Sequence, residues 1–201
     1  SARRSYLEYV IKMFNIGTSI APEYGDIQGK IIYDISPEHK LSIVTLNGDD
    51  HNNPTRLVAE ENDMLYYGNQ DIYQNAGGIV WRALWGHNFV STTTIGYQSS
   101  RFKEDFFETN TGTPLVKNHS NEASGSVRNV NHVRISDVHS FEFGGEFKHL
   151  TASYDNMFGA YSDAVGNSIP SSFITKTFAE NKIGAFINYI VRPLTGLTAT
   201  I

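Results

Sequence analysis

Apolar and polar residues alternate along residues 26–35. The odd-numbered positions of this run are mainly apolar: Ile27, Gly29, Ile31, Tyr33 and Ile35. The even-numbered positions are polar apart from Ile32, and they include Gln28, Lys30 and Asp34. Successive side chains of a β-strand point to opposite faces, so this period predicts a strand with one apolar and one polar face. The apolar face would meet either a protein core or lipid.

The same alternation recurs later in the chain with varying regularity. In residues 141–148 one face holds Phe141, Phe143, Gly145 and Phe147, and the other holds Glu142, Gly144, Glu146 and Lys148. Residues 78–85 alternate in the same way, whereas residues 182–191 split less cleanly. Residues 41–46 alternate poorly, because Leu41 and Ile43 share one face while Val44 and Leu46 share the other.

Strand-like runs predict eight or nine strands, at residues 4–14, 26–35, 41–49, 72–85, 88–102, 126–136, 140–153, 177–191 and 197 onward. Several have ten or more residues, longer than strands of soluble proteins, which usually have about five or six. Short turn-forming links at 36–40, 85–88, 136–140 and 192–196 alternate with long polar links at 50–71, 103–125 and 154–176. Short turns at one end and long loops at the other are typical of an outer-membrane barrel.

Aromatic residues lie near the short-turn ends of these runs: Tyr33, Trp81, Trp85, Phe89, Phe141 and Tyr189. At a membrane boundary they would form an interfacial girdle, and the charged faces would line a wet lumen. We therefore predict an all-β fold, an antiparallel up-and-down meander that forms part of a transmembrane β-barrel. Two alternatives remain open at this stage: a soluble β-sandwich or barrel acting as a binding module, and a porin-like barrel or outer-membrane enzyme.

Composition narrows the function classes. The chain has 201 residues, a formal net charge of -5 and no run of Lys and Arg, which argues against nucleic acid as a partner. It has no cysteine, so disulfides and cysteine metal sites are excluded. No window of about 18 apolar residues predicts a membrane-spanning helix. Its first residues do not have the pattern of a signal peptide.

Two stretches carry a family resemblance. The run "SARRSYLEYVIK" and the following "PEYGDIQGKIIYDISPEHKLSIVTLNGDD" resemble the barrel of TonB-dependent outer-membrane receptors, particularly those of Bacteroidetes-like bacteria. The first element is matched by Arg3, Arg4, Ser5, Tyr6 and Leu7. The second element is matched by Tyr24, Asp26, Lys30, Tyr33, Ser36, Pro37, Lys40, Leu41, Gly48 and Asp50. "HSFEFGGEFKHL" is similar to a later strand of that family.

The resemblance implies a 22-stranded barrel closed around an N-terminal plug, located in the outer membrane of a Gram-negative bacterium. It also implies non-enzymatic uptake of a siderophore, vitamin or glycan, driven by the TonB complex through a short N-terminal segment. No plug, TonB-binding segment or aromatic-ended final strand is identified here, and the last run stops at "GLTATI". We therefore expect residues 1–201 to be an interior barrel segment. The irregular run 41–46 then contains a bulge or packs its lumenal side against the plug.

The sequence predicts no catalytic, cofactor or metal site, and it leaves the substrate-binding residues undefined. His39, His87 and His139 lie at or beside short turns, as solvated turn residues do, and their spacing does not suit a metal. The stretch 48–53, "GDDHNN", gathers oxygen ligands of the kind that calcium uses, but without the spacing of an EF-hand loop. We interpret it as the start of a polar loop.

Other polar clusters are equally consistent with ordinary surface. The carboxylate pairs Glu60–Glu61 and Glu104–Asp105 fall in or beside predicted polar loops, where solvation is the usual role, and no nucleophile elbow occurs. Glu142, Glu146 and Lys148 would share the lumenal face and set the charge of the barrel wall. A predicted external loop places Tyr66, Tyr67 and Tyr73 beside amide side chains, a combination suited to binding a carbohydrate or siderophore. Tyrosine is equally common in the interfacial girdle of a membrane barrel.

Overall fold

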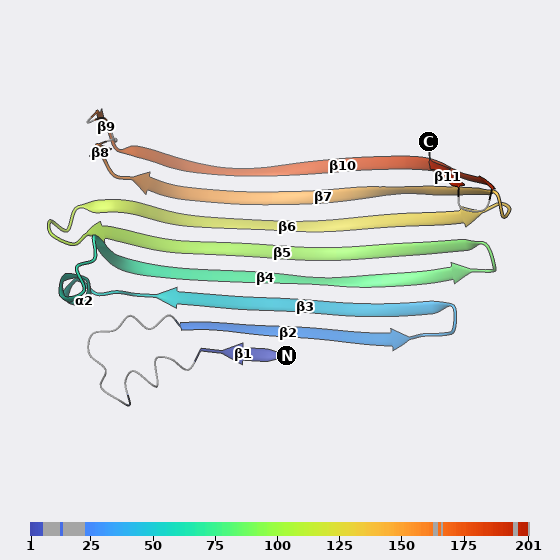
Figure 1. The fold of residues 1–201 in the computed structure, drawn as a ribbon, viewed down its shortest axis with the longest axis horizontal. Helices are drawn as coiled ribbons and strands as arrows, with labels where there is room; N and C mark the ends of the chain where they lie inside the picture. Colours follow the sequence, from blue (N-terminus) through green and yellow to red (C-terminus); the bar gives the residue numbers. More distant parts are fainter. Residues whose placement is uncertain (6–12, 14–22, 163–164, 166, 195–196, 201) are drawn as a thin grey trace.

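The computed structural model describes residues 1–5, 13, 23–162, 165, 167–194 and 197–200, and every structural statement below refers to these. They form one antiparallel sheet in which each strand lies beside its neighbour in the chain (Figure 1). Its strands are β1 (Ala2–Arg4), β2 (Glu23–Asp34), β3 (His39–Asn52), β4 (Tyr66–Trp85), β5 (Phe89–Glu108), β6 (Pro114–Arg134), β7 (His139–Phe158), β10 (Ser172–Leu194) and β11 (Leu197–Thr200). The all-β meander of the predicted fold is confirmed.

Two small elements lie outside this sheet, at the end that carries the long links (Figure 1). Helix α2 (Arg56–Glu61) begins after Thr55, whose side-chain oxygen accepts a hydrogen bond from the Val58 amide. Strands β8 (Tyr161–Ser162) and β9 (Ser168–Ile169) form a separate short hairpin. In the described part of the chain no helix has both the length and the apolar character needed to cross a membrane.

The turns at the opposite end of the sheet are tight, and two of them have the same pattern of hydrogen bonds. In the first, the amides of Ile35 and Ser36 donate to the carbonyl of His39, at 2.9 and 3.3 Å. In the second, the amides of Ile135 and Ser136 donate to the carbonyl of His139, at 3.0 and 3.1 Å. Each serine hydroxyl also accepts an amide from within its turn. An Ile-Ser-x-x-His sequence therefore forms the same hairpin turn in both places.

The predicted long links are much shorter than expected, because most of their residues are strand. Strand β5 continues to Glu108 and β6 begins at Pro114, so the predicted link 103–125 reduces to residues 109–113. The other links reduce to residues 53–65 and 159–171. Polar residues occupy both faces of the sheet in these outer parts, so the hydrophobic alternation that predicts a strand is lost there. The predicted strand 4–14 lies largely outside the described residues, as do Tyr6 and Leu7.

Register sorts the side chains of the sheet into two sets. From β2 to β10, odd-numbered residues pair with odd-numbered ones and even-numbered with even-numbered. The exception is the outer end of the β5–β6 pairing. One face of the sheet therefore carries the odd-numbered residues and the other the even-numbered ones. The bulge considered for residues 41–46 is wrong, because β3 pairs without interruption with β2 and β4. Val44 and Leu46 therefore lie on the even-numbered face. A register shift occurs instead between Phe106 and Phe107, near the outer end of β5.

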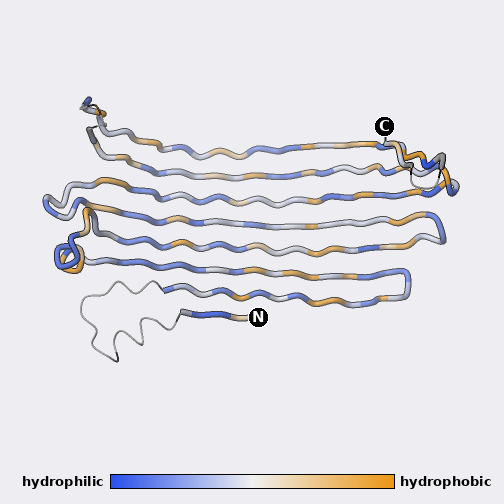
Figure 2. The backbone as a smooth tube through the Cα atoms, viewed as in Figure 1, coloured by the Kyte–Doolittle hydropathy of each residue, from blue (hydrophilic) through white to orange (hydrophobic). Residues whose placement is uncertain are grey.

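Although Ser91, Thr93, Asn129 and Asn131 are polar, and Asn129 Nδ2 donates to Ser91 Oγ at 3.2 Å and to Thr93 Oγ1 at 2.9 Å, the odd-numbered face near the short turns is mainly apolar and uncovered. We call this surface the apolar band: Ile27, Ile31, Tyr33, Leu41, Ile43, Ile79, Trp81, Trp85, Phe89, Ile95, Tyr97, Val127, Val133, Phe141, Phe143, Phe147, Ile183, Ile187 and Tyr189. Ile31 is 65% exposed and Ile183 is 83% exposed. Figure 2 shows apolar positions alternating with polar ones along the strands.

The described residues contain almost no hydrophobic core. The buried apolar side chains among them are Ala59, Ala83 and Ala152. A soluble sheet must bury one face to offset the entropy lost on folding, and a continuous exposed apolar surface of this extent marks contact with lipid or protein. No second layer covers either face of the described sheet, which argues against the β-sandwich alternative.

The assignment of the two faces can be tested by substituting arginine separately at two adjacent positions. Ile31→Arg places the charge in the apolar band, and we expect it to lower the free energy of unfolding by about 2–4 kcal/mol in a bilayer. Ile32→Arg puts the same side chain on the even-numbered face and should change it by no more than about 0.5 kcal/mol. The measurement is denaturant unfolding of the intact protein in lipid vesicles, followed by tryptophan fluorescence. Equal costs for the two variants would contradict the assignment of faces.

Candidate functional site

The even-numbered face opposite the apolar band carries a group of charged side chains. We call it the charged wall: Arg82, Arg128, Glu142, Glu146, Lys148 and Lys182. Strand register places Arg128 opposite Glu146 and Lys148 opposite Lys182. The predicted shared face of Glu142, Glu146 and Lys148 is thus present in the structure.

None of the side chains of the charged wall has an ion-pair or hydrogen-bond partner among the described residues. Arg128 and Glu146 are direct cross-strand neighbours, yet their charged atoms are not within the 4.0 Å of a salt bridge. Lys148 and Lys182 oppose one another with like charge, an arrangement that costs stability. The aromatic ring of Phe186 covers the glycine between the two glutamates, since a Cβ added at Gly144 would lie 2.9 Å from it. The charges of this surface are therefore available to an external partner.

A shallow hollow of about 380 Å³ lies beside the charged wall. Val44 and Leu46 form its apolar side, and Gln98, Ser126 and Lys148 supply polar groups. Glycines 78 and 96 keep its floor low, because neither carries a side chain. The hollow combines apolar and charged surface, as sites for small polar solutes do.

Farther from the short turns, the even-numbered face carries polar side chains that bind one another. Glu104 accepts hydrogen bonds from Gln70 at 2.6 Å and from Asn118 at 2.7 Å, which link β4, β5 and β6. Tyr154 donates to Glu122 at 2.6 Å, and this bond raises the pKa of Tyr154. These groups are satisfied within the protein, so they stabilise the outer part of the sheet.

The outer part of the odd-numbered face is polar as well. Asp71 accepts hydrogen bonds from His51 Nδ1 at 2.7 Å and Asn69 Nδ2 at 2.8 Å, and the bond to His51 is the main cause of the lowered pKa of Asp71. Lys117 Nζ lies 2.6 Å from the Asp155 carboxylate and lowers its pKa in the same way.

One of the three candidate histidines, His39, is not a solvated turn residue, whereas His139 is exposed beside its turn. His39 packs against Trp81 and Trp85, with ring centroids 5.8 and 5.1 Å away, and its Nδ1 is buried without a hydrogen bond among the described residues. His139 stacks on Tyr189, whose hydroxyl lies 2.5 Å from His139 Nδ1. They open strands β3 and β7 and belong to the aromatic girdle at the short-turn end. His87 is exposed in the turn between β4 and β5.

The candidate calcium ligands of residues 48–53 do not converge. Most of this stretch belongs to β3 instead of a loop, so Asp49 and Asp50 point to opposite faces. His51 lies between two carboxylates, with Nδ1 2.7 Å from Asp71 and Nε2 3.6 Å from Asp49. Within the described ranges, no group of three or more His, Cys, Asp or Glu residues could hold a metal ion.

The remaining candidates are also separated by the strand geometry. Glu60 pairs with Arg56 on α2 at 2.9 Å, while Glu104 and Asp105 project from opposite faces of β5. The three tyrosines lie on β4, not in a loop. Tyr66 packs on Phe106 across the even-numbered face, and Tyr67 and Tyr73 lie on the odd-numbered face.

Sequence reasoning missed the charges of the outer part of β5. Arg101, Lys103 and Asp105 occupy odd-numbered positions there, whereas the apolar residues Phe102 and Phe106 occupy even-numbered ones. The even-numbered positions there also include Glu104 and Glu108, so no apolar face in the sequence marks this extension.

The contact between His51 and Asp71 makes stability depend on pH. The folded protein lowers the pKa of Asp71, so the contact stabilises above the unfolded pKa and is lost as the pH falls through the lower folded pKa. We expect Asp71→Asn to destabilise most near neutral pH and least below about pH 4. In a His51→Ala background the same substitution should have a smaller effect that hardly varies with pH. Unfolding titrations of the four proteins test this, and an unchanged effect of Asp71→Asn in that background would contradict it.

Comparisons with known proteins bear on the fold. No protein-family model matches the sequence, and no curated protein matches it. Four chains of known structure match, among them the copper transporter OprC, with a TM-score of 0.54 and 9% sequence identity. The match covers 86% of this chain and 28% of the OprC chain, so residues 1–201 span about a quarter of that protein's length. The likeness shows the fold: an all-β antiparallel meander that forms part of a β-barrel.

Proposed function

We propose that the chain forms part of the wall of an outer-membrane barrel that takes up a nutrient in a Gram-negative bacterium. The observation that carries the proposal is the contrast between the two faces of one sheet. The odd-numbered face presents an uncovered apolar band, and the even-numbered face behind it presents charges without partners among the described residues. Lipid outside and a wet lumen inside account for both faces.

The dimensions of the sheet support this arrangement. From Phe89 to Tyr97 the apolar band extends about 26 Å along β5, or about 20 Å along the membrane normal at a tilt of about 40°. Outer-membrane barrels have an apolar belt about 25 Å tall. Strands of 20 residues such as β4 and β5 extend well beyond such a belt. In the proposed orientation the short turns are periplasmic, and the polar outer parts project from the cell.

In this orientation the charged wall and the adjoining hollow form the surface that faces the lumen. We propose that they face either the transported solute or a plug domain, and that Val44 and Leu46 pack against that domain. In the TonB-dependent family resembled by the sequence, the plug and the segment that binds the TonB complex come from elsewhere in the protein. We propose the same division here, with a siderophore, vitamin or glycan as the cargo and no enzymatic step. The narrower resemblance to receptors of Bacteroidetes-like bacteria stays a prediction from the sequence motifs.

Nutrient-limited growth tests the proposal. Deletion of the gene should abolish growth on one scarce nutrient from a panel of siderophores, vitamins and glycans, and disruption of the TonB complex should reproduce the defect. Uptake that persists without the TonB complex would favour a porin-like barrel instead. Purification of the intact protein as a monomer without detergent would contradict a membrane location.

A residue-level prediction uses adjacent positions on β6. Arg128→Ala removes a charge from the wall and should lower the rate of solute uptake at least threefold at an unchanged level of the protein in the outer membrane. Val127→Ala truncates the neighbouring side chain on the apolar band and should leave that rate within about 20% of wild type, because a small apolar change at the lipid surface leaves the lumen intact. Equal effects of the two substitutions would contradict the assignment of the lumen.

A further inference from the structure

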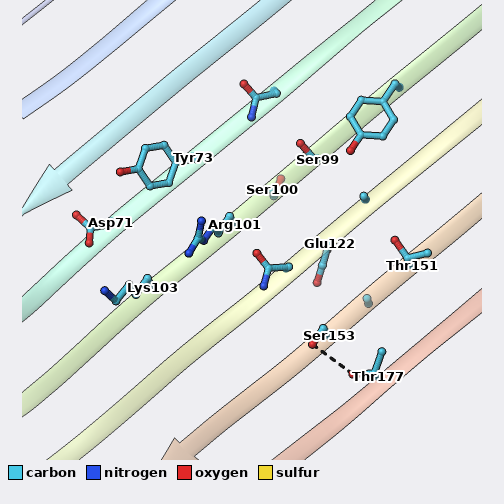
Figure 3. A pocket seen from close by; sticks show the side chains of 15 residues that line it. Asp71, Tyr73, Ser99, Ser100, Arg101, Lys103, Glu122, Thr151, Ser153 and Thr177 are labelled. Atoms are coloured by element: carbon cyan, nitrogen blue, oxygen red, sulfur yellow. Dashed lines mark hydrogen bonds between the residues drawn. The ribbon is translucent and has the colours of Figure 1, made fainter.

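A second hollow lies on the odd-numbered face, directly beyond the apolar band. It has a volume of about 650 Å³ and crosses β4 to β7 and β10. Figure 3 shows Arg101 and Lys103 on β5 close to Asp71 and Tyr73 on β4, with Ser153 and Thr177 on the far side. We call this surface the outer hollow: Tyr73, Ser99, Arg101, Lys103, Asn121 and Ser153. It faces away from the charged wall, so it is no part of the proposed solute path.

Its height places the outer hollow at the edge of a bilayer. Along β5 the odd-numbered face changes from Ile95 and Tyr97, which belong to the apolar band, to Arg101 four residues beyond Tyr97. Four residues span about 13 Å along the strand, and about 10 Å along the membrane normal at a tilt of about 40°. The headgroup region on each side of a bilayer begins where the hydrocarbon ends and is several ångström thick. Because Arg and Lys side chains are long and flexible, both cations of the outer hollow reach that region.

The two cations of the outer hollow form no contact ion pair in the described part of the chain. Arg101 and Lys103 are exposed, and neither has an ion-pair or hydrogen-bond partner among the described residues. Asp71 lies directly opposite Lys103, whose positive charge contributes to the lowered pKa of Asp71, and the Asp71 carboxylate also accepts hydrogen bonds from His51 and Asn69.

Three other carboxylates of this face are also engaged. Asp105 lies 2.8 Å from His119 Nε2, and Asp155 lies 2.6 Å from Lys117 Nζ. Asp49 lies 3.6 Å from His51 Nε2. Arg101 and Lys103 therefore remain without a contact ion pair at the boundary of the apolar band, although Asp71 lies opposite Lys103.

The floor of the outer hollow suits an anion with several oxygen atoms. Small side chains, including Ala123 and Thr151, leave the space open. Hydroxyl and amide groups line it, and Thr177 Oγ1 donates to Ser153 Oγ at 3.3 Å (Figure 3). A guanidinium binds two phosphate oxygens in a fixed geometry, and an ammonium adds a point charge. Tyr73 and Tyr97 flank the side nearest the apolar band, where tyrosine commonly meets lipid headgroups.

We propose that the outer hollow binds the phosphorylated headgroup of a membrane lipid, with Arg101 and Lys103 as its cationic ligands. The proposal rests on the proposed function, because it requires the apolar band to lie in the membrane. Charge complementarity and the height of the outer hollow favour a lipid phosphate over a second copy of the chain, since the carboxylates of this same face are already paired.

The test uses the intact protein in mixed micelles that contain either phosphatidic acid or phosphatidylcholine at equal mole fraction. Lipid bound per protein is measured by native mass spectrometry across a titration. We expect phosphatidic acid to bind at least tenfold more tightly than phosphatidylcholine, and Arg101→Gln combined with Lys103→Gln to remove this preference. The matched control, Arg128→Gln combined with Lys148→Gln, removes the same number of charges from the other face and should keep it.

Three results would overturn the proposal. The first is an equal loss of preference in both double variants, and the second is full displacement of the lipid by millimolar inorganic phosphate, which would indicate a free-phosphate site. The third is Arg101-dependent cross-linking of two copies without bound lipid. If the lipid preference is absent while Ile31→Arg and Ile32→Arg still differ in cost, only the headgroup site fails. If those two variants are equivalent, the membrane orientation fails with it.

Discussion

Backbone hydrogen bonding determines what this sheet can and cannot do alone. The described strands pair laterally over 20 residues in the longest cases, so the main chain of β3 to β7 is satisfied within the sheet, whereas β2 and β10 are paired on one side only along most of their length. That pairing leaves the side chains of both faces to find their own surroundings. Only three apolar residues are buried among the described residues. The large apolar side chains of one face therefore need an apolar environment supplied from outside this sheet. In the proposed orientation, lipid meets this need without a second protein layer.

Because the pairing keeps odd-numbered residues opposite odd-numbered ones, the apolar side chains of all these strands lie on the same face of the sheet. Each inter-strand pairing around the apolar band joins odd to odd and even to even, so Ile31, Ile79 and Ile183 contribute to one surface although they are far apart in sequence. A slip of one residue in any strand would move its apolar set to the charged wall. The tight turns limit such slips, and the twice-used Ile-Ser-x-x-His turn fixes the start of β3 and of β7.

Most of the sheet could be predicted from the sequence wherever the two faces differ in polarity. The apolar side chains of residues 26–35 and 141–148 mark strands because they alternate with polar ones, and the short turns carry their own turn residues. The outer parts of β5, β6 and β7 escaped notice because water on both sides imposes no such alternation. The prediction that His39 is a solvated turn residue is wrong. Its place beside a turn is visible in the sequence, but its packing on Trp81 depends on the neighbouring strand β4. The charges of the wall could be placed on a face, whereas their lack of partners depends on side-chain geometry.

The register shift at Phe106 and Phe107 lies far from the short turns, where both faces are wet and parity no longer decides solvation. An inserted or deleted residue at that height costs little, because no side chain is driven from lipid into water. The same change beside Ile95 would reverse the surroundings of a whole strand. The outer rim of this sheet can therefore vary in length and register over evolutionary time, while a single-residue insertion or deletion in the lower part would exchange the two faces of a strand.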